Sequence, residues 1–455
     1  MQCGRVQNYN LLLKLITVKP CGERLRPARA QLAEPPYVDP HVRWCGLREQ
    51  GNCFPLCRCI EYEMTCARPS RRTFLRASFL SGGVLLTGFD KLTGLTASRS
   101  TRVDAFAGGQ LLGSLGFIGE NRAPLNSIIG VGLDARLYTD LSPFTPERHV
   151  TRTEEFYLRT GASERLEPQK PWSIQLRGLV QQPVDLTVDE LKSSTKPMGL
   201  HLMECSGNAR ATRFGMISVA DWAGAPISAM IEAKTKPRTE HVIISGFDEY
   251  PKSSMTSVPG AEWMFTLSQL KASKAFLATE MNGQALSRDH GRPVRLVVPG
   301  WYGCTCIKWV NAVTFTDENA AATSQMQEFA ARTHQQGIPK LARDYRPATI
   351  DQAAMPIRVE KWLVRGKIKY RVVGILWGGS QLVKTLEIRF NPEEDYMRVD
   401  DFSHTTNDPW SFWSHAWTPK TVGTYMIRLR VTDPIVETKR LDSGYYVRTV
   451  EVREI

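Results

Sequence analysis

Residues 108–345 contain short apolar runs whose spacing switches between the period of a strand and that of a helix. Alternating or β-branched runs bounded by turn residues predict several strands. These strands cover Glu155–Arg159, Trp172–Leu179, His241–Gly246, Phe276–Asn282 and Pro293–Gly300. Capping residues followed by apolar periodicity predict helices that begin at Thr187 and that cover Ser218–Ile231 and Thr266–Lys274. Because these elements follow no repeating strand–helix crossover, we predict an α+β domain.

The pattern changes after about Pro356, where strand-like runs follow one another and only turns separate them. The runs are Val359–Ile375, Leu382–Phe390, Gly423–Val431 and Tyr445–Val452. This succession of strands predicts an antiparallel β-sandwich. We therefore expect an α+β domain over residues 108–345 and an all-β domain over residues 346–455.

Composition allows a folded enzyme-sized chain and argues against a nucleic-acid-binding protein. The 455 residues can bury the cores of two or three domains. The formal charge of +12 is concentrated at the start, because residues 1–107 carry 16 Lys and Arg against 8 Asp and Glu. Residues 108–455 carry 42 against 38, which is too even a balance for a general polyanion-binding surface.

The segment that begins at Ser70 resembles a twin-arginine export signal. Arg71 and Arg72 precede a modest apolar run that glycines interrupt, and the run is too short for a permanent membrane anchor. Residues 105–107 (Ala-Phe-Ala) offer a cleavage site. We expect residues 64–107 to be the signal, the mature protein to be periplasmic, and residues 1–63 to be a non-native extension from a misassigned start. The alternative is a basic amphipathic surface segment.

Seven of the ten cysteines precede residue 70, and only Cys205, Cys304 and Cys306 follow it. The spacing of Cys53, Cys57 and Cys59 disfavours a zinc site, since no paired CxxC and no histidine at finger distance accompany it. Cys304 and Cys306 are expected to be structural thiols.

Cys205 lies in the segment HLMECSGNAR, residues 201–210, where an apolar lead-in runs into a tight turn. Its sulfur is therefore expected just past the end of a strand, where it can meet a ligand. The cationic neighbours Arg210 and Arg213 favour the thiolate, which is the metal-binding form. The alternative is that Cys205 is a small buried hydrophobic residue.

Several motifs in order make the chain resemble the sulfite oxidase family of molybdopterin enzymes. They are FYLRT (156–160), ECSGNAR (204–210), GFD (246–248), EMNG (280–283), RDHGRPVRLVVPG (288–300), CIKW (306–309) and RDY (343–345). The resemblance runs from about Glu154 to the C-terminus. It implies an α+β domain that binds molybdenum and molybdopterin, followed by an immunoglobulin-like domain that commonly dimerises.

The resemblance also implies the residues that hold the cofactor. Cys205 corresponds to the thiolate ligand of molybdenum, and soft sulfur suits this metal. Basic residues neutralise the terminal phosphate of the cofactor, while polar and backbone groups bind the pterin edges. The corresponding residues are Phe156, Tyr157, Leu158, Arg159, Thr160, Asp248, His290, Arg295, Cys306, Ile307 and Lys308.

By the same resemblance, the reaction is oxidation of sulfite to sulfate by oxo transfer. Arg159, Arg210 and Arg448 are the implied anion-holding residues, and Tyr345 is the implied hydroxyl beside the reacting centre. Two departures from the family pattern lie near the expected pocket, namely Ala209 where many members have arginine and Gly161 after the FYLRT motif.

The electrons need an acceptor, and the sequence contains no CxxCH haem motif and too few cysteines after residue 107 for an iron–sulfur cluster. We therefore expect an external c-type cytochrome. Two alternatives stay open at this point: a reductase of a sulfoxide or other oxyanion on the same scaffold, and a cofactor-free binding protein.

Overall fold

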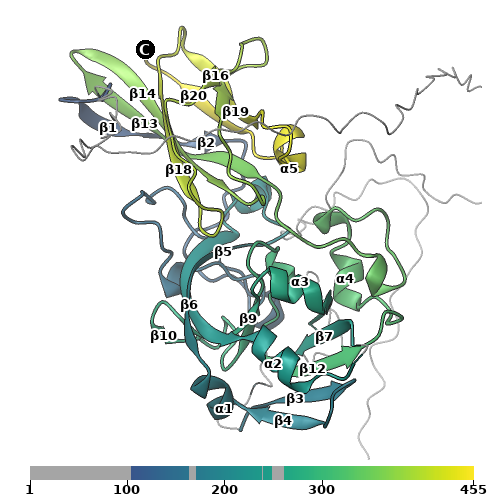
Figure 1. Ribbon diagram of the computed structural model, residues 1–455. Helices are drawn as coiled ribbons and strands as arrows, with labels where there is room; N and C mark the ends of the chain where they lie inside the picture. Colours follow the sequence, from purple (N-terminus) through teal and green to yellow (C-terminus); the bar gives the residue numbers. More distant parts are fainter. Residues whose placement is uncertain (1–103, 163–165, 167–170, 238, 248–260) are drawn as a thin grey trace, which may run out of the picture. The chain divides into compact units, whose positions relative to one another are not determined.

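The described strands form four five-stranded sheets, and short helices connect some of these strands (Figure 1). The structure is a computed structural model that describes residues 104–162, 166, 171–237, 239–247 and 261–455. Residues 108–455 belong to one compact unit. The expected export signal and extension lie outside the described residues, except for residues 104–107, and Asp248 lies outside them altogether.

Two of the sheets, with helices α1–α4, form a module that we call the cofactor module. One sheet has the order β10–β9–β6–β5 with β11 also paired to β9, and the other has the order β4–β3–β12–β7–β8. The strands are β3 (Ser173–Gly178), β4 (Val184–Thr187), β5 (Lys196–Glu204), β6 (Ile217–Pro226), β7 (His241–Gly246), β8 (Glu262–Thr266), β9 (Phe276–Met281), β10 (Gln284–Ala285), β11 (Arg295–Val297) and β12 (Val310–Thr316). Only the pairing of β3 with β12 is parallel among the described ladders of these sheets.

The other two sheets form the C-terminal module, and their pairings are all antiparallel among the described strands. One sheet has the order β1–β13–β14–β18–β17 and the other has the order β16–β15–β19–β20–β2. The strands are β1 (Gln110–Leu115), β2 (Phe117–Ile118), β13 (Ala353–Val364), β14 (Lys367–Trp377), β15 (Leu386–Arg389), β16 (Met397–Arg398), β17 (Asp401–Phe402), β18 (Ser411–Trp417), β19 (Gly423–Val431) and β20 (Arg448–Val452).

The expected domain boundary needs a correction at the start of residues 108–345. Figure 1 shows β1 beside β13, and Leu115 pairs with Val359 in that ladder. Phe117 of β2 pairs with Val450 of β20. Residues 110–118 therefore belong to the C-terminal module, because both strands find their hydrogen-bonding partners more than 200 residues further along the chain.

The helices are short, so the described fold is mostly β with few helices rather than an even α+β mixture. They are α1 (Val188–Ser193), α2 (Ile227–Lys234), α3 (Leu267–Ala272), α4 (Ser324–Glu328) and α5 (Lys439–Asp442). Single 3₁₀ turns cover Gly132–Asp134, Thr153–Glu155, Arg210–Thr212, Gly303–Thr305, Ala331–Thr333 and Ala342–Asp344. No described helix has the length and apolar character needed to cross a membrane.

Local capping chemistry begins two of these helices where the sequence predicts them. Thr187 accepts a hydrogen bond from the backbone N–H of Glu190, whose side chain accepts from the N–H of Thr187 in return. Thr266 and Gln269 form the same reciprocal arrangement before α3. Each box satisfies two backbone donors that the first helical turn leaves without partners.

The helix expected over Ser218–Ile231 is wrong over most of its length. Residues 217–226 form strand β6, and only Ile227 onward is helical. β6 is a central strand, paired with β5 on one side and β9 on the other. Most of its residues are buried on both faces, so its apolar run lacks the alternation that distinguishes a strand from a helix.

Candidate functional site

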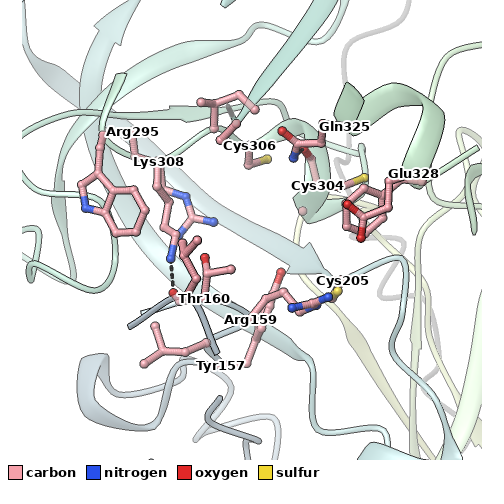
Figure 2. Close-up of a pocket in the computed structure, with 17 residues that line it drawn as sticks. Tyr157, Arg159, Thr160, Cys205, Arg295, Cys304, Cys306, Lys308, Gln325 and Glu328 are labelled. Atoms are coloured by element: carbon pink, nitrogen blue, oxygen red, sulfur yellow. Dashed lines mark hydrogen bonds between the residues drawn. The ribbon is translucent and has the colours of Figure 1, made fainter. Parts of the chain in front are cut away.

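A cavity with about 840 Å³ of empty space, including its open mouth, lies beside the end of β5 in the cofactor module (Figure 2). Nine of the residues expected at the site line it. They are Tyr157, Leu158, Arg159, Thr160, Cys205, Arg295, Cys306, Ile307 and Lys308. Segments separated by up to about 150 residues in the chain therefore meet around one space.

Cys205 follows the last residue of β5, as the sequence predicts, and its side chain is buried. The backbone N–H of Cys205 donates to the carbonyl of Met216 at 2.9 Å, and the N–H of Asn208 donates to the carbonyl of Cys205 at 2.9 Å. The N–H of Gly207 lies 3.4 Å from Cys205 Sγ. A fixed turn with an N–H directed at the sulfur favours a thiolate ligand.

The loop that contains Tyr157–Thr160 is not the regular strand that its sequence predicts. Leu158 forms an isolated bridge with Leu137, and the N–H of Tyr157 donates to Ser218 Oγ at 3.1 Å. Within the described residues this loop forms no β ladder, and Tyr157–Thr160 line the cavity.

His290 supports this loop from behind instead of lining the cavity. Its Nε2 lies 3.2 Å from the carbonyl oxygen of Phe156, and its Nδ1 lies 2.7 Å from Ser287 Oγ. Burial, and secondly the positive Arg295, lower the pKa of His290 to about 4. A neutral ring satisfies both contacts if Nε2 donates to Phe156 and the serine hydroxyl donates to Nδ1. Phe156 is fully buried and likewise does not line the cavity.

Arg295 and Lys308 place two cations at one side of the cavity, away from Cys205 (Figure 2). Lys308 Nζ donates to the carbonyl oxygens of Asp289, at 2.9 Å, and of Thr160. Burial lowers the pKa of Lys308 well below its usual value, and the nearby Arg295 lowers it further. The buried Nε of Arg295 has no hydrogen-bond partner within the described structure. Such a pair is arranged for an anion, which would supply the missing acceptor and offset the repulsion.

Glycine permits close approaches on two walls. A Cβ added to Gly303 would lie 2.4 Å from the hydroxyl oxygen of Tyr157. At Gly291, where φ is +110°, a Cβ would lie 3.1 Å from Cβ of Arg295 and 3.2 Å from Cβ of Lys308. A side chain at either position would therefore push on a cavity-lining residue.

Cys304 and Cys306 also line the cavity, and neither forms a disulfide. Burial raises the pKa of both thiols above the usual value for cysteine. The N–H of Val298 lies 3.4 Å from Cys306 Sγ. Both sulfurs are thus favoured in the protonated form, which agrees with a structural role and leaves Cys205 as the candidate ligand.

Three expected catalytic residues are absent from the described cavity lining. Arg210 is exposed and donates to the carbonyl oxygen of Val447 at 2.6 Å. Arg448 is buried, and its Nε and Nη2 each lie 2.7 Å from the carboxylate of Glu120. Tyr345 lines a separate small pocket, where its buried hydroxyl has no partner within the described structure.

Eight other described lining residues were not expected at the site from the sequence. They are Leu133, Ala261, Gly303, Cys304, Trp309, Gln325, Glu328 and Phe329. Gln325 Nε2 donates to the carbonyl of Cys304 at 2.7 Å. Gln325 and Glu328 are three residues apart on α4, so helical spacing places them on one face, but nothing in the sequence indicates which face meets the cavity.

Arg440 is another residue that the sequence analysis missed. It lies on α5 of the C-terminal module, and its Nη2 donates to the carbonyl oxygen of Ser206 at 2.7 Å. Arg440 therefore contacts the Cys205 turn from the last part of the chain, whereas Arg448 forms an ion pair with Glu120. The sequence offers no spacing signal that separates these two arginines.

The donor set of the cavity fits a molybdenum–pterin cofactor. One buried thiol is available to the metal, while Arg295 and Lys308 can bind the phosphate of the cofactor. Among the described residues there is no group of three His, Cys, Asp or Glu side chains that could hold a metal ion by itself. A thiol at a strand end beside an anion site suits a metal whose other ligands come from an organic cofactor.

Comparison with known proteins agrees with this chemistry. Residues 161–324 match the family described as "Oxidoreductase molybdopterin binding domain". The chain is 32% identical to "Sulfite oxidase, mitochondrial" of Rattus norvegicus over 165 residues, which cover 32% of this chain and 29% of that protein. It is 25% identical to a "Nitrate reductase (NADPH)" of Beauveria bassiana over 327 residues, which cover 61% of this chain and 35% of that protein. The chain thus spans about a third of the length of these two relatives.

The fold is similar to that in "Crystal Structure of the Sulfane Dehydrogenase SoxCD from Paracoccus pantotrophus", with a TM-score of 0.54 and 18% identity. The match covers 81% of this chain and 96% of that one. Fold, cavity and relatives together define a molybdopterin-dependent oxidoreductase. Within that class, both sulfite oxidases and nitrate reductases are among the relatives, and the matched domain together with these relatives implies a cofactor of molybdenum with molybdopterin. A cofactor-free binding protein is thereby set aside.

Proposed function

We propose that the protein oxidises sulfite to sulfate and passes the electrons to an external c-type cytochrome. The observation that carries this proposal is the charge of the cavity. Among its described lining residues, Arg159, Arg295 and Lys308 stand against one carboxylate, Glu328, around the Cys205 thiol. A cationic, partly enclosed space favours a small oxyanion. The net reaction consumes sulfite and water and releases sulfate, two protons and two electrons. When bound, the cofactor supplies the oxygen atom and accepts the electrons.

The side chains of the cavity have distinct parts in this proposal. Cys205 holds the metal, and Arg295 and Lys308 bind the cofactor phosphate. Arg159 then remains to hold and orient the sulfite oxyanion, for which a planar guanidinium is well suited. This assignment differs from the one implied by resemblance, since Arg210, Arg448 and Tyr345 do not line the described cavity.

The test is an assay of the molybdenum-loaded protein with sulfite and either ferricyanide or oxidised cytochrome c. We expect sulfite-dependent reduction of both acceptors. Arg159→Gln is expected to raise KM for sulfite by about 10-fold or more, the loss typical of a charged hydrogen bond to a ligand. Arg122→Gln, an exposed arginine that is not among the residues lining the cavity, is the matched control. Loaded protein that leaves both acceptors oxidised would refute sulfite oxidation.

A second candidate function is reduction of an oxyanion such as nitrate, or of a sulfoxide. The similarity to the Beauveria bassiana nitrate reductase favours it, because that match covers 61% of the chain. The same cationic cavity is compatible with nitrate. An assay with a reduced viologen dye and either nitrate or methionine sulfoxide separates the two functions, since a reductase would oxidise the dye and leave sulfite unchanged.

Three further proposals concern the whole protein. Arg71 and Arg72, with the apolar run and the Ala-Phe-Ala sequence that follow, support export to the periplasm by the twin-arginine route. Sequencing of the exported protein should find a new N-terminus near Gly108.

The two antiparallel sheets of the C-terminal module support an immunoglobulin-like fold that forms a homodimer. Light scattering of the purified protein measures its oligomeric state, and a monomer at working concentration would exclude the dimer.

A further inference from the structure

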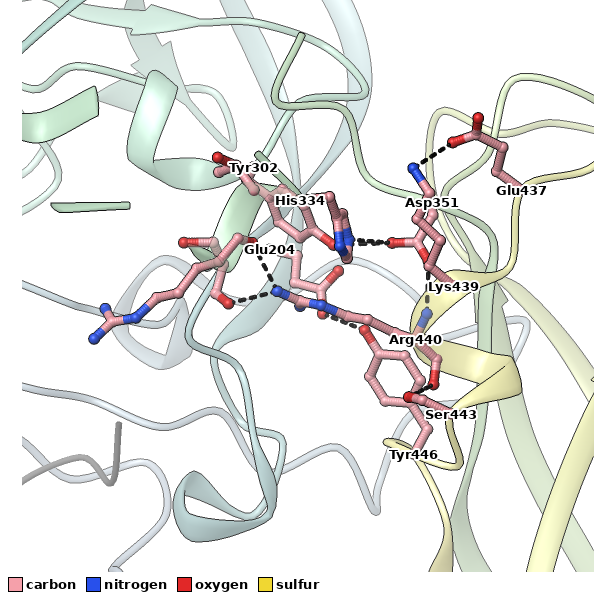
Figure 3. Close-up of polar contacts among 12 residues, drawn as sticks. Glu204, Tyr302, His334, Asp351, Glu437, Lys439, Arg440, Ser443 and Tyr446 are labelled. Atoms are coloured by element: carbon pink, nitrogen blue, oxygen red, sulfur yellow. Dashed lines mark hydrogen bonds and ion pairs between the residues drawn. The ribbon is translucent and has the colours of Figure 1, made fainter. Parts of the chain in front are cut away.

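A buried polar cluster connects the Cys205 turn with the C-terminal module (Figure 3). We call it the Glu204 cluster, and it comprises Glu204, Tyr302, Asp351, Trp377, Arg440 and Tyr446. Glu204 immediately precedes Cys205, whereas Trp377, Arg440 and Tyr446 belong to the C-terminal part of the chain. The cluster therefore joins the candidate metal ligand to a distant segment.

The carboxylate of Glu204 is fully buried and accepts hydrogen bonds from three side chains. Trp377 Nε1 donates to Oε2 at 2.8 Å, and the hydroxyl of Tyr446 donates to Oε1 at 3.2 Å. Asn208 Nδ2 donates to Oε1 at 3.1 Å, which ties the two ends of the Cys205 turn together. Glu204 is thus held from the C-terminal side by two aromatic side chains and itself holds the turn.

Arg440 supplies the opposite charge and a second hold on the same turn. It is 4% exposed, and its Nη2 donates to the carbonyl oxygens of Ser206, at 2.7 Å, and of Arg332, at 2.9 Å. Its backbone N–H donates to Asp351 Oδ2 at 3.0 Å. Tyr302 donates from its hydroxyl to Asp351 Oδ1 at 3.1 Å, and Arg440 lies over its ring. Contacts from the C-terminal module therefore reach the residues on both sides of Cys205.

Burial of these charged groups contributes little to the stability of the fold, which suggests that the cluster has a geometric role. Burying a carboxylate and a guanidinium removes both from water, and apolar residues of similar size often stabilise a fold as well or better. A buried, hydrogen-bonded charge does fix direction, because any displacement breaks several charge-assisted bonds in a medium of low dielectric constant. Groups behind a metal ligand orient that ligand and tune the metal.

We propose that Glu204 is a positioning residue, whose buried carboxylate, held by Trp377 and Tyr446, fixes the direction in which Cys205 presents its sulfur to the cofactor. The C-terminal module thereby contributes to the metal site without lining the cavity. This inference rests on the molybdenum cofactor and is independent of which oxyanion is the substrate.

The test compares loaded Glu204→Gln, Tyr446→Phe and Glu360→Gln proteins. Tyr446→Phe removes only the hydroxyl that donates to Glu204. Glu360 is the matched control, because it is also a buried carboxylate, paired with Arg358 at 2.7 Å in the C-terminal module, and it is not among the residues that line the cavity. Each protein is reduced with dithionite, and the electron paramagnetic resonance spectrum of Mo(V) is recorded together with molybdenum content and melting temperature.

We expect Glu204→Gln and Tyr446→Phe to shift the g values of the Mo(V) signal, while Glu360→Gln leaves the parent spectrum. Turnover should fall by about 10- to 100-fold in Glu204→Gln, as is typical when a group behind a metal ligand is changed. A purely structural carboxylate would lower the melting temperature and leave the spectrum as it was. Parent spectra in loaded Tyr446→Phe and Glu204→Gln, or equal shifts in all three variants, would overturn the proposal.

If Glu204→Gln fails to fold or to load, Tyr446→Phe decides the question alone. Dithionite generates the signal without any substrate. A protein that shows the expected shifts and yet ignores sulfite would therefore contradict the proposed function and leave the positioning role intact.

Discussion

The indole Nε1 of Trp377 lies 2.8 Å from Oε2 of Glu204, although the two residues are 173 positions apart in the chain. This hydrogen bond connects the last residue of β14 with the last residue of β5, one position before Cys205. The metal-binding turn is therefore supported from outside the cofactor module. Removal of one side of this contact should change the environment of the metal, whereas changes in the C-terminal module that leave the Glu204 cluster intact should affect stability alone.

Replacement of Cys205 by serine should abolish turnover. A hydroxyl is a poor substitute for a soft thiolate on molybdenum, so we expect a loss greater than about 100-fold, beyond that seen for groups behind a ligand. The measurement is kcat/KM for sulfite, with molybdenum content determined on the same sample. Full activity in Cys205→Ser would mean that the metal has another protein ligand.

The loaded and cofactor-free proteins should respond differently to Lys308→Met. In the loaded protein the change removes a charged hydrogen bond to the cofactor phosphate, worth about 1.5–3 kcal/mol. Without the cofactor, loss of a cation beside Arg295 partly compensates for the lost bonds to Thr160 and Asp289. Melting temperatures of the two forms should show the larger decrease for the loaded protein. Equal decreases would place the phosphate elsewhere.

Stability should fall on acidification through the titration of His290. In the unfolded state the His290 ring has its ordinary pKa of about 6.5. In the folded state, burial and the positive Arg295 lower this pKa to about 4. The free energy of unfolding should therefore decrease as the pH falls from about 6.5 to about 4, by about 3 kcal/mol in all, and then level off. His290→Gln should flatten this part of the pH profile in denaturant unfolding.

Arg448 is expected to stabilise the fold rather than to bind substrate. Its side chain and that of Glu120 are 6% and 5% exposed, so Arg448→Ala would leave a buried carboxylate without its partner. We expect a loss of about 3–5 kcal/mol in the free energy of unfolding and an unchanged KM for sulfite. Arg453→Ala, which breaks an exposed pair with Glu451, should change little. If Arg448→Ala instead raised KM for sulfite without lowering the free energy of unfolding, Arg448 would be a substrate-binding residue.

Two tyrosines allow a direct test of which hydroxyl serves the cavity. Tyr157 lines the cavity, whereas Tyr345 lies in a separate pocket with a buried hydroxyl that has no described partner. Removing an unpartnered buried hydroxyl is nearly neutral or stabilising. Tyr345→Phe should therefore keep kcat/KM close to the parent value, and Tyr157→Phe should lower it. The reverse order would support the catalytic role that resemblance implies for Tyr345.

Sequence patterns predicted the local features of the fold well where short-range contacts decide them. The capping boxes at Thr187 and Thr266 depend on a residue three positions further on, and both are present. β6 shows the limit of this reasoning, because its expected helical form was wrong. It pairs with β5 and β9, and most of its residues are buried on both faces, so the alternation that would have marked a strand is absent.

The candidate site likewise contains residues that short motifs indicated and residues that only long-range packing brings together. Residues adjacent in short motifs, such as Tyr157–Thr160 and Cys306–Lys308, meet at the cavity as the resemblance implied. The resemblance implied Arg448 at the site and did not point to Arg440. In the structure Arg440 contacts the Cys205 turn, whereas Arg448 pairs with Glu120. These two arginines are eight positions apart in the chain, and what distinguishes them is the set of groups that each one contacts.

By itself, the sequence indicated a cysteine at a strand end and motifs that resemble those of a molybdopterin enzyme, and this resemblance implied the basic residues of an anion site. Tertiary structure alone decided which charged side chains line the cavity and which form ion pairs elsewhere, such as Arg448 with Glu120. It also decided which side chains form hydrogen bonds to Glu204. The physical reason is that residue type and short-range spacing fix what a group can do. Long-range packing fixes its partners, and hydrogen bonds and burial act only between groups that the fold has brought together.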